Sequence, residues 1–242
     1  MSNIIAVASG KGGVGKTMFS ANIGAKLAQK GNSVVLIDMD LGLRSLDICL
    51  GLENRVVYDL SDILSGLCRI KQALIKDRRF GDFYLISAAY DKTKVDVTPL
   101  HIKVLCERLK EKFDYIIFDA PAGIGDGLDL AVGVADVVVI VTTPEYVALR
   151  AADNLDGKLM EKGIKKRAYV VNKIKCNLIE LGELPSITEI SNLLKPQMLG
   201  AIQYDESIHV SYNSGMPIVL DEQSYIDENF NNIANRLIEI TE

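Results

Sequence analysis

Residues 10–17 read GKGGVGKT, and this stretch decides the fold because it satisfies the phosphate-loop pattern G-x-x-x-x-G-K-[ST]. It lies between NIIAVAS, which is typical of a buried strand, and a segment of helical period, residues 17–30, that ends at Gly31. Glycines let backbone N–H groups turn towards phosphate oxygens, and the start of the following helix adds partial positive charge. A purely structural glycine-rich turn is the alternative interpretation.

Short runs rich in Val and Ile alternate with segments of helical period along the chain. The predicted strands are nearly continuous apolar runs, as strands covered on both faces require: NIIAVAS, NSVVLID, DFYLISA, DYIIFDA, DVVVIVTT, RAYVVNK and MLGAIQY. The predicted helices cover residues 17–30, 59–66, 99–112, 128–134, 145–161, 187–195 and 224–240. This alternation predicts an α/β fold of the P-loop NTPase type, with a mostly parallel central sheet flanked by helices on both faces. No repeat or linker interrupts it, so we expect residues 1–242 to form a single domain.

Composition and charge narrow the class of protein. Apolar residues make up 48% of the 242, which excludes a disordered chain, and a net charge of −5 supplies no general basic field, so no nucleic-acid partner is expected. We expect no signal peptide, and the longest later apolar run, VVVIV, is too short to span a bilayer, so a cytoplasmic protein is predicted. The cysteines show no metal-like spacing and are expected to be small buried hydrophobic side chains: Cys49, Cys68, Cys106 and Cys176.

Chemically specialised residues follow the predicted strands, where parallel sheets bind their ligands. Lys16 is expected to reach the β- and γ-phosphates of a nucleotide, and the Thr17 hydroxyl to ligate Mg²⁺. Asp119 ends its strand and could hold a water of the Mg²⁺ shell, with capping of the next loop as the alternative. Asp38 and Asp40 follow the second strand, where one could orient the attacking water and the other support the metal shell, although turns favour Asp anyway.

Six blocks between Ile4 and about Leu220 together resemble the MinD branch of the deviant Walker A (MinD/ParA) ATPase family: SGKGGVGKT, IDMDLGLRSLD, RVVYDLSDILSG, FDAPAGI, TTPE and VVNK. The resemblance implies an enzyme that binds ATP with Mg²⁺ and hydrolyses the ATP. The nucleotide-binding residues that it implies are Gly10, Lys11, Gly12, Gly13, Val14, Gly15, Lys16, Thr17, Met18 and Asn172, the last of these at the adenine. It also implies that Lys11, Lys16, Asp38 and Asp40 serve catalysis and that Thr17 and Asp119 serve the metal.

The loop carries a second lysine, Lys11, which a simple phosphate loop does not need. In the family that the chain resembles, this lysine reaches across a sandwich dimer to the phosphates bound by the other subunit. During hydrolysis, negative charge develops on the triphosphate of ATP, and its stabilisation needs more positive charge than one lysine and one Mg²⁺ supply. The resemblance therefore implies an ATP-dependent homodimer, with a solvated loop charge as the alternative interpretation of Lys11.

As a function, the resemblance implies a switch ATPase that recruits a division inhibitor and is reset by slow hydrolysis, stimulated by an ATPase-activating protein. A ParA-like or flagellar-placement ATPase, with DNA or a polar landmark as its scaffold, is the alternative, and an ATP-dependent ligase or an iron–sulfur carrier is a more remote one. The chain departs from the family at Met18, where a second hydroxyl residue is usual, and at Gln203, where proline is usual. Binding should survive the first change because the N–H of Met18 remains available to the α-phosphate. Asp205 is expected to approach the adenosine.

The last predicted helix has apolar residues at alternating spacings of four and three, which form one stripe: Ile226, Phe230, Ile233, Leu237 and Ile240. Its polar face is acidic, whereas a helix that lies on an anionic membrane needs Lys and Arg there. Family members associate peripherally with the inner face of the cell membrane through a basic amphipathic tail, and this chain stops at NRLIEITE without one. We therefore expect the stripe to cover the sheet and this chain not to bind membranes directly.

Overall fold

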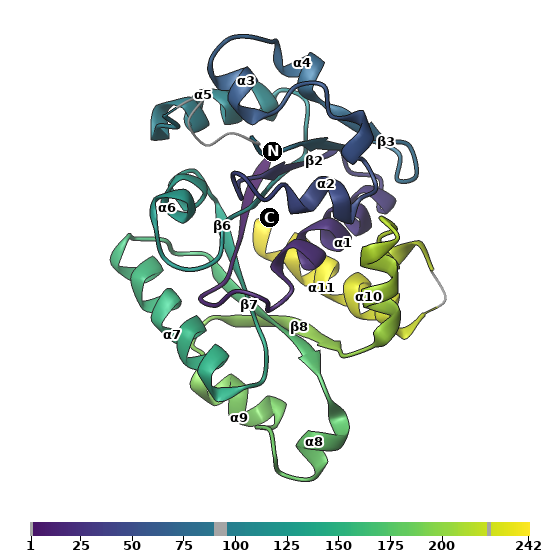
Figure 1. The fold of residues 1–242 in the computed structure, drawn as a ribbon. Coiled ribbons are helices and arrows are strands. Elements are labelled where there is room, and N and C mark those ends of the chain that lie inside the picture. The colour runs from purple at the N-terminus through teal and green to yellow at the C-terminus, as the bar shows by residue number, and fades with distance from the viewer. Residues whose placement is uncertain (1, 90–95, 222–223) are drawn as a thin grey trace.

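The computed structural model describes residues 2–89, 96–221 and 224–242, and its strands form one eight-stranded sheet (Figure 1). The strands are β1 (Asn3–Ala8), β2 (Val34–Asp38), β3 (Ile75–Asp77), β4 (Phe83–Ile86), β5 (Tyr115–Asp119), β6 (Val137–Thr142), β7 (Arg167–Ile174) and β8 (Gln197–Gln203). They lie in the order β3-β4-β2-β5-β1-β6-β7-β8, and only the β3–β4 pair is antiparallel. The predicted mostly parallel sheet is confirmed.

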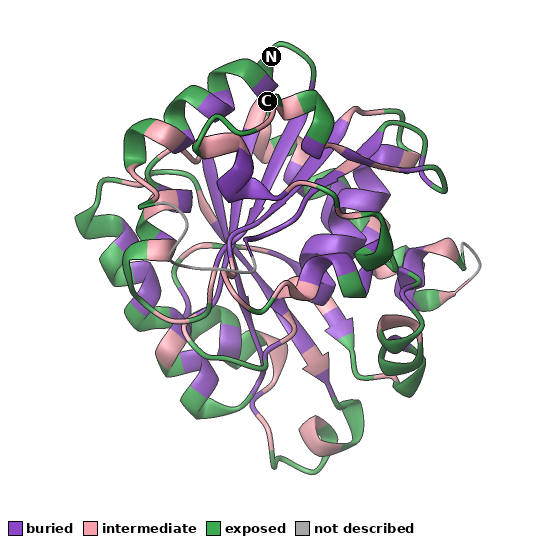
Figure 2. Cartoon of the chain, turned by 45° about the horizontal axis from the view of Figure 1, so that its top comes forward, coloured by how far each residue is buried: buried purple, intermediate pink, exposed green. Residues whose placement is uncertain are grey.

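Helices cover both faces of this sheet, and each layer has its own apolar core. One face carries α1 (Lys16–Gln29), α2 (Ser45–Cys49), α10 (Glu206–Asn213) and α11 (Tyr225–Thr241). The other carries α3 (Leu60–Leu64), α5 (Pro99–Lys110), α6 (Asp126–Val132), α7 (Tyr146–Glu161) and α9 (Ile187–Leu193). The strands between the layers are buried almost throughout (Figure 2), which explains why their sequences read as continuous Val and Ile runs.

Local signals in the sequence set several helix ends. The hydroxyl of Thr98 accepts a hydrogen bond from His101 N, and Pro99 opens α5 as its first residue. Gly31 follows α1 with a φ of 90°, a left-handed conformation that glycine adopts without steric cost. These ends were predicted because a cap needs only a few consecutive residues.

The apolar stripe of the last helix faces the protein interior, as predicted. Phe230 of α11 stacks on Phe19 of α1 with ring centroids 6.1 Å apart, and both side chains are fully buried. Asp227, on the flank of the stripe, forms a buried ion pair with Lys26 of α1 at 2.5 Å. Helix α11 also packs against β8, so it closes the core on this face of the sheet (Figure 1). None of the helices in the described ranges is long and apolar enough to cross a membrane.

Short elements are the part of the fold that the sequence did not predict. These are β3, α2, α10, α4 (Ile70–Ala73), α8 (Cys176–Glu180), and the 3₁₀ turns η1 (Glu53–Arg55) and η2 (Ile218–Leu220). They are too brief to show a hydrophobic period, so tertiary contacts decide their conformation. The prediction that every cysteine is buried is wrong. Cys49 and Cys106 are buried, but Cys68 is half-buried and Cys176 is exposed on α8, a short surface helix without a buried residue.

Candidate functional site

The predicted phosphate loop joins β1 to α1 at the carboxyl edge of the sheet. Gly13 and Gly15 have φ values of 78° and 92°, and a Cβ on Gly15 would lie 2.3 Å from the amide nitrogen of Asn172. The first intrahelical bond of α1 runs from Phe19 N to Gly15 O at 2.9 Å. The N–H groups before it, those of Lys16, Thr17 and Met18, therefore remain available at the helix N-terminus, as an anion site requires.

The buried side chains of Lys16 and Asp119 form one cluster with the half-buried Thr17 at this loop. Lys16 Nζ lies 2.9 Å from Asp119 Oδ1, and the Thr17 hydroxyl donates to Asp119 Oδ2 at 2.8 Å. Ser20, one turn along α1, donates to Asp119 Oδ1 at 2.8 Å. Asp119 is fully buried, so these donors stabilise its charge inside the protein. The structure thus brings three predicted residues together and adds Ser20, which the sequence analysis did not single out.

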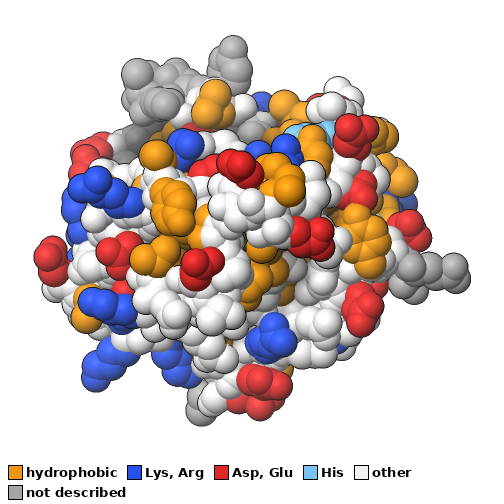
Figure 3. Space-filling model, turned by 90° about the horizontal axis from the view of Figure 1, so that it is seen from below, with side chains coloured by type: hydrophobic (Ala, Val, Ile, Leu, Met, Phe, Trp, Pro, Cys, Tyr) orange, Lys and Arg blue, Asp and Glu red, His pale blue; other side chains and the backbone are white. Residues whose placement is uncertain are grey.

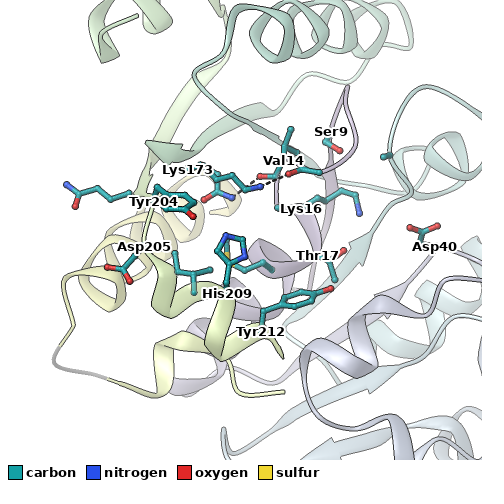
Figure 4. Close-up of a pocket in the computed structure, with 17 residues that line it drawn as sticks. Ser9, Val14, Lys16, Thr17, Asp40, Lys173, Tyr204, Asp205, His209 and Tyr212 are labelled. Carbon is teal, nitrogen blue, oxygen red and sulfur yellow. Dashed lines mark hydrogen bonds between the residues drawn. The ribbon is translucent and has the colours of Figure 1, made fainter. Parts of the chain in front are cut away.

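Asp38 and Asp40, predicted as a pair, occupy different environments. Asp38 is fully buried, and its carboxylate accepts from Asp40 N at 2.9 Å and from Leu46 N at 3.1 Å. Burial, with the nearby negative charge of Asp119, raises the pKa of Asp38 to about 7. Asp40 is half-buried and lines a cavity of about 310 Å³ that the phosphate loop borders (Figure 4). Asp38 therefore fixes the backbone of the segment that follows β2, while Asp40 faces the cavity, where a ligand can enter.

The far side of the cavity comes from β7, the end of β8 and α10. Asn172 donates from Nδ2 to Val14 O at 2.8 Å, and Lys173 donates from Nζ to Gly13 O at 2.7 Å. Both residues thereby hold the phosphate loop against β7. Lys173 has a φ of 58°, which is uncommon for a residue with a side chain and aims its amine at the loop.

Helix α10 and the end of β8 supply residues that the sequence did not identify as part of a site. Ile208 and Tyr212 of α10 line the cavity together with Met18, and Figure 4 shows the Tyr212 hydroxyl directed towards Thr17. Burial is the main cause that raises the pKa of Tyr212 to about 12, so its hydroxyl stays a neutral donor. Gln203, where the family usually has proline, and Asp205, expected to approach the adenosine, both line the cavity. No sequence motif marks α10, whose eight residues meet the loop only through the tertiary fold.

Arg79 ties α10 to α2, the helix that follows the Asp38 loop. Its guanidinium pairs with the buried carboxylate of Asp77 at 2.6 Å, donates to Gly215 O at 2.9 Å, and also donates to Leu50 O. Gly51 and Gly215 touch through their backbones, because a Cβ on Gly215 would lie 2.5 Å from Gly51 Cα. Helix α10, which lines the cavity, is therefore fixed to α2 at the carboxyl ends of the two helices.

Lys11 is placed differently from the rest of the loop. Its side chain is exposed, and it is absent from the described residues that line the cavity. The segments that follow β2, β5 and β6 at the same edge of the sheet also carry exposed apolar side chains: Leu43, Ile124, and Tyr146 and Val147 at the start of α7. Figure 3, which views the molecule from the side towards which β7 runs, shows hydrophobic side chains among charged ones on that face. The phosphate loop thus opens onto a partly apolar surface.

Comparisons with known proteins agree with this geometry. A family model described as an AAA domain matches residues 2–169. The chain is 44% identical to the septum site-determining protein MinD of Bacillus subtilis (strain 168) over 240 residues, 98% of this chain and 90% of that protein. The solved MinC:MinD cell division protein complex of Aquifex aeolicus is 38% identical, with a TM-score of 0.91 and coverage of 98% and 96%. The MinD structure with Mg-ADP from Pyrococcus horikoshii OT3 is 26% identical, with a TM-score of 0.87 and coverage of 98% and 96%.

Proposed function

The chain belongs to the MinD family of septum site-determining proteins, and from this membership we propose that it is an ATP-switched ATPase that helps to place the division septum. The observation that carries the proposal is the cluster of Lys16, Thr17 and Asp119 at the phosphate loop. No observation on the described residues favours the partition or flagellar-placement alternative.

The phosphate loop is the proposed binding site for the triphosphate. Positive φ at Gly13 and Gly15 and the open N-terminus of α1 support this role, because backbone N–H groups there can donate to phosphate oxygens. Lys16 lies at the edge of the cavity, with its ammonium held by Asp119. We expect the ammonium to exchange part of this contact for the β- and γ-phosphates when ATP binds.

The residues present fit Mg²⁺. The Thr17 hydroxyl and the Asp119 carboxylate provide two oxygen atoms 2.8 Å apart, and Mg²⁺ takes few protein ligands of this kind. Ser9 adds a buried hydroxyl at the cavity that has no hydrogen-bond partner among the described residues. Thr17 and Asp119 would hold the ion, which when bound neutralises charge on the phosphates.

Asp40 is the proposed residue that orients the attacking water, because its carboxylate faces the cavity. Asp38 supports it indirectly, since its carboxylate holds the N–H of Asp40. A water held in line with the terminal phosphate attacks phosphorus, the bond to the leaving diphosphate breaks, and ADP and phosphate result. We expect this reaction to be slow in the isolated chain and faster with an activating protein.

Lys11 is the proposed contribution of a second copy of the chain. It is exposed and lies outside the cavity of its own chain, so it is free to reach a phosphate bound by a partner across the partly apolar face. ATP would thereby link two copies, and the dimer would recruit a division inhibitor, by analogy with the Aquifex aeolicus complex, in which MinC accompanies MinD. Asn172 and Asp205 would lie at the nucleoside end.

The test is ATP turnover per chain measured over a range of protein concentrations, with Mg²⁺ and with EDTA. A dimeric active form predicts that turnover per chain rises with protein concentration, and that light scattering shows dimers with ATP but not with ADP. Turnover that is independent of protein concentration, or unaffected by EDTA, would contradict the proposal.

A further inference from the structure

A second hollow, of about 730 Å³, lies between α3–α4 and α5, at the top of Figure 1. Its floor consists of apolar side chains that are only half-buried: Ile63, Leu64, Ile70 and Leu74. We call this hollow the α5 groove. It shares no residue with the nucleotide cavity.

Helix α5 forms one wall of the groove and leaves apolar side chains in solvent. Leu100 is 67% exposed and Val104 is 48% exposed, four residues further along the helix. Residues at this spacing lie on the same face of a helix. Exposed apolar side chains that adjoin an apolar floor form a contiguous patch, which marks an interaction site more often than scattered residues do.

The banks of the groove are basic, although the chain as a whole is acidic with a net charge of −5. Arg69 and Lys71 lie on the α4 side, Arg108 and Lys112 on the α5 side, and Glu111 is the carboxylate among the lining residues. None of these four cations pairs with a carboxylate of the described residues. Four cations against one anion make the groove a positive channel with an apolar floor.

We propose that the α5 groove binds an acidic amphipathic helix of a partner protein. Leucine-like side chains on one face of such a helix would fill the apolar floor, and its Asp and Glu residues would meet the basic banks on either side. Charge complementarity of this kind gives specificity and fast association, while burial of the apolar face gives most of the affinity.

The shape and chemistry of the groove favour an acidic helix over three other occupants: a membrane, a single-stranded nucleic acid and a second copy of this chain. A bilayer is broad and would meet the raised banks, leaving the recessed floor out of reach. Single-stranded nucleic acid needs exposed rings for base stacking, but Phe113 in the lining is buried and the half-buried ring of His101 is the other one present. A second copy of this chain would present the exposed apolar side chains of its own α5, but those side chains adjoin the same cations that line the groove, so like charges would meet.

The test is fluorescence anisotropy of the full chain with two labelled 16-residue helical peptides. Both have Leu at positions i, i+3, i+4 and i+7, with Glu at the remaining positions in one and Lys in the other. We expect the Glu peptide to bind about tenfold more tightly than the Lys peptide at low salt, and the difference to shrink as salt rises.

Matched variants locate the binding. Arg108→Glu, on a bank of the groove, should weaken binding of the Glu peptide about tenfold, whereas Lys103→Glu, the same charge change on α5 outside the groove, should change it less than about twofold. Val104→Ser should also weaken binding, with Val57→Ser, at a more exposed valine outside the groove, as its control. ATP turnover of all four variants should equal that of the parent, so a failure here is distinguishable from a failure of the ATPase proposal.

Equal binding of the two peptides, or equal effects of Arg108→Glu and Lys103→Glu, would overturn the proposal. Pelleting with anionic vesicles that Arg108→Glu abolishes, without binding of the Glu peptide, would assign the groove to a membrane instead. Self-association that the same variant abolishes would assign it to a second copy, and either result would also overturn the proposal.

Discussion

The two sides of the nucleotide cavity are built in different ways. The phosphate side comes from one short segment of the chain, Ser9 and residues 13–18, completed by Asp119 from the neighbouring strand. The nucleoside side is assembled from two segments that lie far apart in sequence: Asn172 and Lys173 of β7, and the end of β8 with α10. The phosphate loop can be recognised in the sequence because its conformation depends on its own glycines. The nucleoside side cannot, because it forms only when distant segments pack together.

Because the phosphate side holds the groups proposed to act on ATP, changes there should reduce ATP turnover more than changes on the nucleoside side. Loss of Lys16 should have the largest effect. Lys16→Ala removes the charge that we propose for the phosphates and leaves Asp119 buried without its ion-pair partner. We expect ATP turnover to fall about 10³-fold and nucleotide-dependent dimers to disappear. Isothermal titration calorimetry with Mg-ATP measures the loss, and circular dichroism serves as the folding control. Turnover within tenfold of the parent would remove Lys16 from the proposed mechanism.

Asp40 should separate catalysis from binding on the same side of the cavity. Asp40→Ala removes a carboxylate that faces the cavity but leaves the loop and Asp119 intact. We expect ATP to bind with nearly unchanged affinity and dimers to form, while kcat falls about 10²-fold. Single-turnover hydrolysis at saturating ATP measures the effect. A variant that hydrolyses ATP at the parent rate would show that another group orients the water.

Arg79 should show how far the two sides depend on each other. Arg79→Met leaves Asp77 buried without a charge partner and breaks the tie between α2 and α10. We expect a loss of about 3 kcal/mol in the free energy of unfolding and, at a temperature where the variant is folded, a higher KM together with a lower kcat. Arg78→Met is the control, because Arg78 is the exposed neighbour outside this tie. Equal effects of the two changes would mean that Arg79 contributes only surface charge.

A substitution on the nucleoside side should have the smallest effect, and it should change ATP binding but not the rate of hydrolysis. Ile208→Ala removes apolar contact area from the cavity wall without touching the phosphate loop. We expect KM for ATP to rise about fivefold while kcat stays the same. Val210→Ala, on the exposed side of α10, is the matched control. A larger fall in kcat than in affinity would show that α10 acts on the chemistry as well.

Much of the fold was predictable because its elements are long and regular. The seven predicted strands are all present within two residues of their expected ends, and the stripe of the last helix correctly predicted its buried face. The edge strand β3 and helix α10 were missed, since three or eight residues carry too little periodicity. Within the site, the role of Lys173 as a tether depends on its left-handed backbone, and no residue pattern signals that conformation.

The roles of Asp38 and Asp40 also depend on packing that the sequence does not reveal. Asp38 and Asp40 look equivalent in the motif IDMD, because spacing reports only that both follow the strand. Their difference arises from the turn, which places two backbone N–H groups on Asp38 and leaves Asp40 beside the cavity. Only the folded structure therefore distinguishes the role of Asp38 from that of Asp40.

The central claim, that two copies of the chain share one reaction through Lys11, is tested most directly by mixing Lys11→Ala with Lys16→Ala. In a mixed dimer, the chain that retains Lys16 receives Lys11 from the other chain, so one of the two sites is complete. We predict that each variant alone hydrolyses ATP at background rate and that the mixture recovers a substantial part of the parent turnover. If Lys11 acts only on the phosphates of its own chain, no mixed dimer contains a complete site. A mixture that stays at background, although light scattering shows mixed dimers, would contradict the account.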